Sequence, residues 1–212
     1  MLSSVPAVKS PEFEFWFDFG STYSYPAAIN IEKLTAAHGL AVRWRPFVLG
    51  AIFEDQNWSD SPFNLYPAKG SYMWRDMERI CQAQNVELNR PTEFPRNGIL
   101  AARVVTAFDN APWISDFIRH IFTANFALDL NIADFDVVGS CLETLDLDPT
   151  PILEDAVMPE NKSALRAQTD RAKQLGIFGA PTFAINGELF WGNDRLGEAI
   201  AWTVRNSTPA LS

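Results

Sequence analysis

The sequence predicts an α/β fold that carries a large all-helical insertion, and two observations support this class. Four phenylalanines between residues 13 and 19 alternate with other side chains, a period of two that marks a β-strand with one apolar face. After a second strand-like stretch at 40–49, strand patterns return only at 182–191, whereas the apolar residues between about 67 and 175 recur with helical spacing. Strands at both ends of a helical middle indicate one sheet interrupted by helices.

The first strand leads into a predicted βαβ unit. Gly20 allows a sharp turn, and a helix is predicted over 23–38, with Pro26 in its first turn and Gly39 just past its end. Residues 40–49 are predicted to form a second strand, parallel to the first. Residues 50–66 are rich in Asn, Asp, Ser and Pro, which predicts a long loop with a functional role.

The central part of the chain is predicted to be all-helical, with prolines between its helices. The candidate helices are 69–84, 97–109, 112–127, 134–144, 150–155 and 160–175. We therefore expect a domain made of residues 12–66 and 176–206, interrupted by a helical insertion domain of residues 67–175.

The end of the chain predicts a β-hairpin and a closing helix. Strands are expected at 182–185 and 188–191, and Asn186-Gly187 between them is a strong signal for a type I′ turn. A final helix is expected to begin after Gly192. The order β-α-β, helical insertion, β-β-α is the arrangement of a thioredoxin fold.

Composition and charge exclude several classes of function. The net charge of −9 argues against a nucleic-acid partner, and no apolar run is long enough to span a membrane. Residues 1–11 have no continuous apolar core, so no secretory signal is expected. Cys81 and Cys141 are far apart and form no CxxC motif, which predicts buried, reduced thiols and a cytoplasmic protein. His38 and His120 are isolated, so neither a histidine metal site nor a Ser-His-Asp triad is supported.

Ser21 lies where the first strand passes into the first helix. A helix N-terminus presents unpaired N–H groups and a positive dipole end, which suit an anion such as a thiolate. Ser is also a preferred helix N-cap, and from this stretch alone the capping role is favoured.

The sequence Gly179-Ala180-Pro181 precedes the third predicted strand. Its proline is a candidate for a cis peptide bond, and Ala180 would then offer its backbone groups to an extended peptide. A simple turn before a strand is the alternative.

Five motifs occur together in the chain and carry a family resemblance. They are Phe17–Tyr25, Lys69–Met73 followed by Asp76, Phe94–Asn97, Phe178–Thr182 and Phe190–Arg195. From about residue 13 to 205 the chain resembles the 2-hydroxychromene-2-carboxylate isomerase family, kin of the kappa-class glutathione transferases within the DsbA-like thioredoxin folds. This resemblance implies glutathione as the bound thiol.

The resemblance also implies roles for individual residues. Ser21 would stabilise the glutathione thiolate, Ala180 would contact the peptide of glutathione, and the γ-glutamyl end would lie at Gly192, Asn193, Asp194 and Arg195. Asn57 and Asn97 are implied to contact the substrate. Ser21 and the helix dipole together would lower the thiol pKa by about one to three units. The segment Ser21-Thr22-Tyr23-Ser24 contains no cysteine, which excludes thiol–disulfide exchange by the protein at this position.

Two residues depart from the family pattern. Thr22 stands where the family usually has a proline, and Gly98 stands where some members carry a substrate-binding tyrosine. Five aromatic residues remain candidates for an apolar pocket, namely Trp58, Phe63, Tyr66, Tyr72 and Trp74.

The expected function is a glutathione-dependent isomerase that acts on an unsaturated or cyclic hemiketal carboxylic acid, as in aromatic catabolism. A kappa-like glutathione transferase and a non-catalytic glutathione-binding protein are the alternatives. The resemblance further implies a homodimer, with glutathione and a small molecule as partners and no nucleic acid or membrane.

Overall fold

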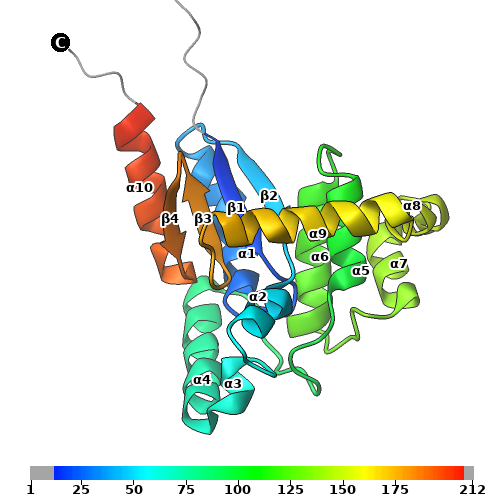
Figure 1. Ribbon diagram of the computed structural model, residues 1–212, viewed down its shortest axis with the longest axis horizontal. Helices are drawn as coiled ribbons and strands as arrows, with labels where there is room; N and C mark the ends of the chain where they lie inside the picture. The colour runs from blue at the N-terminus through cyan, green and yellow to red at the C-terminus, as the bar shows by residue number, and fades with distance from the viewer. Residues whose placement is uncertain (1–11, 208–212) are drawn as a thin grey trace, which may run out of the picture.

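The computed structural model describes residues 12–207 and shows a four-stranded sheet flanked by helices (Figure 1). The strands are β1 (Phe13–Phe17), β2 (Val42–Pro46), β3 (Thr182–Ile185) and β4 (Glu188–Trp191), in the order β2-β1-β3-β4. β1 is parallel to β2 and antiparallel to β3, and β4 is antiparallel to β3. The predicted α/β class with a helical insertion and the parallel βαβ unit are confirmed. Residues 1–11, for which no secretory signal is expected, lie outside the described residues.

The predicted apolar face of β1 is confirmed, and the structure shows that the opposite face of the strand is buried as well. Its phenylalanines face one core, while Trp16, at 0% exposure, packs in a second core with Phe47 and Ala172. The second face is covered because α9 (Pro159–Gln174) crosses the sheet (Figure 1). Glu14 is also buried on this face. Its carboxylate tolerates burial because it accepts hydrogen bonds from Trp16 Nε1 and from two arginines.

The opposite face of the sheet is covered by α1 (Ser24–Ala36) and α10 (Leu196–Ser207). α1 ends two residues before the predicted boundary, and Gly39 follows it with a φ of +67°. Asn186 and Gly187, between β3 and β4, have φ values of +51° and +90°. Two positive φ angles are the signature of a type I′ turn, so the predicted hairpin is confirmed.

All six predicted central helices are present, with ends within two residues of those expected. They are α4 (Pro67–Gln84), α5 (Ile99–Ala107), α6 (Ile114–Phe126), α7 (Phe135–Glu143), α8 (Pro149–Ala156) and α9. None of the helices in residues 12–207 is long and apolar enough to cross a membrane.

The segment 50–66 was predicted as a loop but contains two short helices, α2 (Leu49–Asp55) and α3 (Pro62–Leu65). Pro62 occupies the first turn of α3, and Ser61 Oγ accepts a hydrogen bond from Phe63 N at 3.3 Å. The Ser and Pro that indicated a loop are thus the start signals of a short helix.

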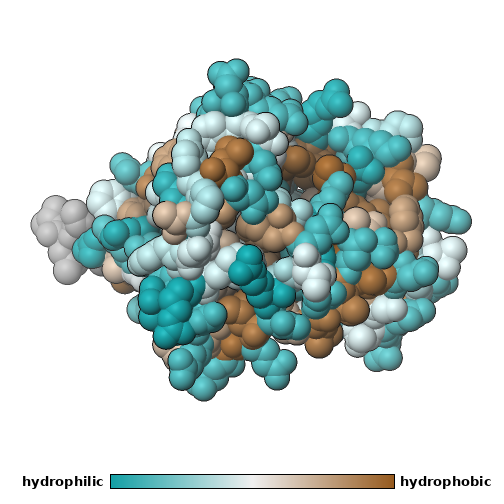
Figure 2. Space-filling view, turned by 90° about the horizontal axis from the view of Figure 1, so that it is seen from below, coloured by the Kyte–Doolittle hydropathy of each residue, from teal (hydrophilic) through white to brown (hydrophobic). Residues whose placement is uncertain are grey.

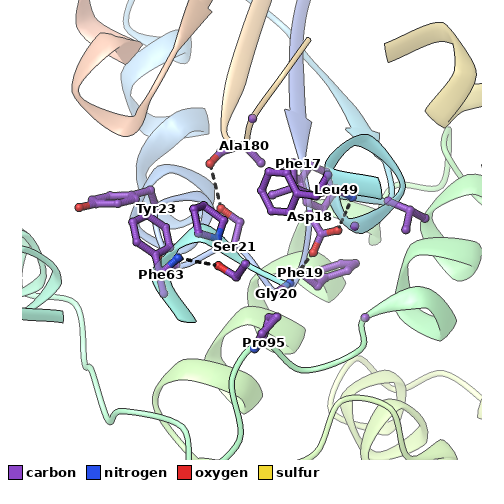
Figure 3. A pocket seen from close by; sticks show the side chains of 18 of the residues that line it. Phe17, Asp18, Phe19, Gly20, Ser21, Tyr23, Leu49, Phe63, Pro95 and Ala180 are labelled. Atoms are coloured by element: carbon purple, nitrogen blue, oxygen red, sulfur yellow. Dashed lines mark hydrogen bonds between the residues drawn. The ribbon is translucent and has the colours of Figure 1, made fainter. Parts of the chain in front are cut away.

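The apolar core of the sheet continues into the helical region. Phe122 of α6 lies with its ring centroid 5.8 Å from Phe17 and 5.0 Å from Phe19. The division into two domains remains a prediction. What the fold decides is that the end of β1, the start of α1 and the loops around Pro95 and Pro181 meet at one side of the sheet, as Figure 3 shows for Phe17, Ser21, Pro95 and Ala180.

Candidate functional site

A cavity of about 970 Å³ opens where β1 ends and α1 begins. Its walls include Leu49 of α2, Phe63 of α3 and the loop 94–98, together with the segments around Ala180 and Asp194. The volume is at the upper end of the range for small-molecule sites, about 300–1,000 Å³. Figure 2 views the molecule from the side on which α3 and α4 lie, and apolar residues are exposed there between polar ones.

Ser21 joins two segments that are 159 residues apart in the chain. Its Oγ donates a hydrogen bond to Ala180 O at 3.0 Å and accepts one from Ser24 N at 3.3 Å (Figure 3). Its backbone N–H donates to Asp18 O at 3.0 Å, and Ser21 is only 9% exposed. The residue before α1 is Tyr23, which makes no side-chain capping bond. Ser21 therefore caps the first turn and also lines the cavity, so the capping role and a ligand role are compatible.

The loop that faces Ser21 has the backbone form considered in the sequence analysis. The Ala180–Pro181 peptide bond is cis. A second cis bond, Phe94–Pro95, lies in the opposite cavity wall and was not predicted. Gly192 N donates to Pro181 O at 2.9 Å, which fixes the turn after β4 against the cis-proline loop.

The turn Gly192–Arg195 lies at the rim of the cavity. Gly192 has a φ of +115°, a conformation that favours glycine, and Asn193–Arg195 form one turn of 3₁₀-helix. The Asp194 carboxylate is 72% exposed and lies 3.5 Å from Arg195, which also pairs with Glu198 at 3.1 Å. Asp194 thus has access to both the cavity and solvent.

The structure brings together most of the residues singled out in the sequence. Ser21, Ala180 and all four residues of the turn 192–195 line one cavity, and Asn97 lies in the same wall. Asn97 Oδ1 accepts a hydrogen bond from Ile99 N at 2.9 Å, at the start of α5. Asn57 is exposed and lies outside the set of residues that line the cavity, although its neighbours Gln56 and Trp58 belong to that set.

Of the five candidate aromatic residues, Trp58 and Phe63 line the cavity. Tyr66 and Tyr72 are exposed on the surface, and Trp74 is buried against Phe94 at a centroid distance of 5.1 Å. The proposed apolar pocket is therefore formed by two of the five.

Asp18 lies in the cavity wall, although its sequence position did not single it out. Its carboxylate accepts hydrogen bonds from Gly20 N at 2.7 Å and Leu49 N at 2.9 Å (Figure 3). Burial raises the pKa of Asp18, and the two N–H hydrogen bonds oppose that shift. Asp18 ties the Ser21 turn to α2. A carboxylate immediately after an apolar strand was the available signal.

Sequence reasoning also missed a pair of residues that face the cavity, one just before α1 and one in α4. Tyr23 Oη donates a hydrogen bond to Asp76 Oδ2 at 3.1 Å, and both residues line the cavity. Burial, with the Asp76 carboxylate as the next cause, raises the pKa of Tyr23 above its ordinary value. Tyr23 therefore stays protonated and serves as a hydrogen-bond donor at neutral pH.

The loop 94–98 is held by a buried arginine. Arg96, 6% exposed, contacts Asn125 O at 3.2 Å and also pairs with Asp129. Asn125 Nδ2 in turn donates to Phe19 O at 2.9 Å. Gly98 lies directly against Phe19, because a Cβ placed on Gly98 would be 2.5 Å from Phe19 Cβ. Both terminal nitrogens of the Arg96 guanidinium bond within this scaffold, whereas its buried Nε has no hydrogen-bond partner in the described residues.

Neither cysteine contributes to the site. Cys81 and Cys141 are free and buried, as predicted, and burial raises the pKa of each thiol to about 11. Within residues 12–207, no group of three or more His, Cys, Asp or Glu side chains is arranged to hold a metal ion.

Comparisons with known proteins agree with the observed fold. The family model described as a DSBA-like thioredoxin domain matches residues 12–199. A 2-hydroxychromene-2-carboxylate isomerase from Sphingobium xenophagum is 28% identical over 185 residues, covering 86% of this chain and 93% of the relative. Glutathione S-transferase kappa 1 from Caenorhabditis elegans is 24% identical over 201 residues, covering 88% of each chain.

A solved structure of a 2-hydroxychromene-2-carboxylate isomerase superposes with a TM-score of 0.83 at 22% identity. The match covers 92% of this chain and 95% of that one. At this level of identity the likeness establishes the fold, and the thioredoxin fold expected from the order of elements is confirmed.

Proposed function

Because this chain belongs to the DSBA-like thioredoxin domain family, we propose that it is a glutathione-dependent isomerase of an unsaturated or cyclic hemiketal carboxylic acid. The bound thiolate adds to an activated carbon and forms a C–S bond, so that a neighbouring double bond becomes a single bond. Rotation about that bond follows, and the thiolate then leaves as the double bond re-forms. Glutathione is regenerated and no net redox change occurs.

The observation that carries the proposal is the Ser21 hydroxyl, 3.0 Å from Ala180 O at the wall of the cavity. A hydroxyl at a helix N-terminus suits a thiolate that arrives with the ligand. No cysteine is present in residues 21–24 to supply one. A hydrogen bond to a charged group contributes about 1.5–3 kcal/mol, which lowers the thiol pKa by about one to two units.

Binding would exchange one hydrogen bond for two. The Ser21 hydroxyl has a single proton, which it donates to Ala180 O in the free protein. When the thiolate sulfur accepts the hydrogen bond from the Ser21 hydroxyl instead, the Ala180 carbonyl becomes available for an N–H of the glutathione backbone. Asp194 would pair with the γ-glutamyl ammonium. The N–H of Asn193 would bind the γ-glutamyl carboxylate, because Gly192 N and Arg195 N already donate to Pro181 O and Gly192 O and hold the turn 192–195 in shape.

The second substrate would lie beside Trp58 and Phe63, with Asn97 as a polar contact; Asn57 remains a candidate contact from the same segment as Trp58. A kappa-like transferase is the second candidate, favoured by the relatives that bear that name. In that case the glutathione adduct would be released rather than resolved. A cytoplasmic location, a role in aromatic catabolism and a homodimer remain predictions.

Glutathione titrations with the wild type and Ser21→Ala test the proposal. We expect the wild type to bind glutathione with a thiol pKa below the ordinary value of about 8.5, and Ser21→Ala to raise that pKa by about one to two units. The ultraviolet absorbance of the thiolate reports the pKa, and S-methylglutathione serves as the blank. An equal thiol pKa in the two proteins would reduce Ser21 to a helix cap.

Turnover separates the two enzyme classes. With 2-hydroxychromene-2-carboxylate as the test substrate, an isomerase converts it while the glutathione concentration stays constant, and a transferase consumes one glutathione for each product. If the protein binds glutathione but does not convert this substrate by either route, it is a glutathione-binding protein without enzymatic activity.

A further inference from the structure

Thr22, the residue after Ser21, contains a buried hydroxyl without a hydrogen-bond partner. Thr22 is 1% exposed and is one of the residues that line the cavity. Its Oγ1 makes no hydrogen bond to any part of the chain that the structure describes. A buried hydroxyl without a partner destabilises the folded state, so its presence beside Ser21 calls for a second role.

Two backbone N–H groups in the same turn are also unpaired. Ser24 N and Tyr25 N bond back to the carbonyl oxygens of Ser21 and Thr22, each at 3.2 Å, and Ser21 N bonds to Asp18 O. The N–H groups of Thr22 and Tyr23 make no hydrogen bond within residues 12–207. They stand at the positive end of the 13-residue helix α1.

Ser21 and Thr22 differ in whether their hydrogen-bond donors already have acceptors. The one proton of Ser21 Oγ is already donated to Ala180 O, and Ser21 Oγ accepts from Ser24 N. A thiolate accepts several hydrogen bonds, and each donor that approaches the charged sulfur lowers the thiol pKa further. Thr22 supplies one unengaged N–H and one unengaged hydroxyl within a residue of Ser21.

We propose that Thr22 is a second donor to the bound thiolate, through its backbone N–H and its hydroxyl, and that it shares the charge of the sulfur with Ser21. This inference rests on the proposed glutathione function. It assigns a catalytic contact to the residue that departs from the proline of the family pattern, and proline would supply neither donor.

Ser24 provides a matched control within the same turn. Its Oγ is also buried and without a hydrogen-bond partner in the described residues, but Ser24 does not belong to the residues that line the cavity. If both hydroxyls are merely unsatisfied, removing either one stabilises the protein and changes nothing else. If Thr22 contacts sulfur, only the change at Thr22 alters the thiol.

The experiment uses the full chain with Thr22→Val, Thr22→Ser and Ser24→Ala. Val keeps the shape of Thr without its hydroxyl, and Thr22→Ala replaces it if Val does not fit. The pKa of bound glutathione is measured by thiolate absorbance, and the melting temperature by circular dichroism. We expect Thr22→Val to raise the bound thiol pKa by about one unit, a tenfold change in the ionisation constant, while its melting temperature rises. Thr22→Ser and Ser24→Ala should keep the wild-type pKa.

An unchanged thiol pKa in Thr22→Val, with Ser21→Ala shifted, would overturn the role of Thr22 and leave the proposed function standing. An equal pKa shift in Ser24→Ala would also overturn it, because the effect would then be a general one on the turn. If the wild type binds no glutathione, the proposed function and the role of Thr22 fail together.

Discussion

Replacing Gly98 with alanine tests how tightly the cavity wall is built. Gly98 precedes α5 with a φ of −100°, so an L-residue is allowed there and only the space decides the outcome. The added Cβ would lie 2.5 Å from Phe19 Cβ, well inside van der Waals contact. Phe19 is 1% exposed, and its ring packs 5.2 Å from Phe17 and 5.0 Å from Phe122. Because Phe19 has no free volume to move into, the substitution overpacks the core.

Overpacking of this kind costs about 1–3 kcal/mol. For a chain of this size, each kcal/mol lowers the melting temperature by about 2–4 °C, which predicts a loss of about 2–12 °C for Gly98→Ala. Gly197→Ala is the matched control, because nothing lies within 4 Å of the added Cβ and Gly197 is in α10. That change should instead stabilise the protein by about 0.4–1 kcal/mol, because alanine restricts the unfolded chain more than glycine does.

Thermal unfolding of the two variants without ligand measures both effects. A Gly98→Ala protein that melts at or above the wild-type temperature would refute the reasoning. It would mean that Phe19 yields, and that a side chain at position 98, including the tyrosine of some family members, fits beside the cavity.

Three further predictions concern the ligand, the thiols and pH. Asp194→Ala should weaken glutathione binding by about 1 kcal/mol, roughly fivefold in Kd, a modest effect because the carboxylate is 72% exposed. Calorimetry should show a smaller loss of affinity for Cys-Gly, which lacks the γ-glutamyl group, and equal losses would contradict a γ-glutamyl contact. Replacing Cys81 and Cys141 together with alanine should leave glutathione-dependent turnover unchanged, and loss of turnover in a folded double variant would contradict their inert role. The N–H of Thr92 and the guanidinium of Arg96 hold the pKa of Asp129 below its usual range. The Asp129 carboxylate therefore stabilises the folded protein at pH values above the unfolded pKa of about 3.9. This stabilisation is lost as the pH falls through the lower pKa of the folded state. The stability difference between the wild type and Asp129→Asn should therefore shrink below about pH 4 in thermal melts, and a constant difference would contradict this.

The sequence predicted well wherever local signals decide the structure. The period of two in β1, the Asn186-Gly187 turn and the prolines between the central helices each depend on nearby residues, and the structure confirms the elements that they predict. The segment 50–66 failed because Ser61 and Pro62 are compatible with both a loop and a short helix, and only packing chooses between these.

The candidate site was partly predictable for the same reason. Ser21 and Ala180 could be singled out because each lies in a recognisable local motif, a strand–helix junction and a Gly-x-Pro turn. Their hydrogen bond across 159 residues could not be derived from either motif. Asp18 and the Tyr23–Asp76 pair were missed because their partners come from distant segments.

What the sequence determined by itself is the α/β order of elements, the absence of cysteine from residues 21–24 and the chemistry offered at the start of the first helix. Only the tertiary structure decided that Ser21 faces the Ala180 carbonyl and that the buried Thr22 hydroxyl has no hydrogen-bond partner in the described residues. It also decided that a side chain at position 98 has no room beside Phe19. The physical reason is that propensity and turn chemistry act over a few residues, whereas burial and hydrogen-bond satisfaction depend on which segments the fold brings into contact.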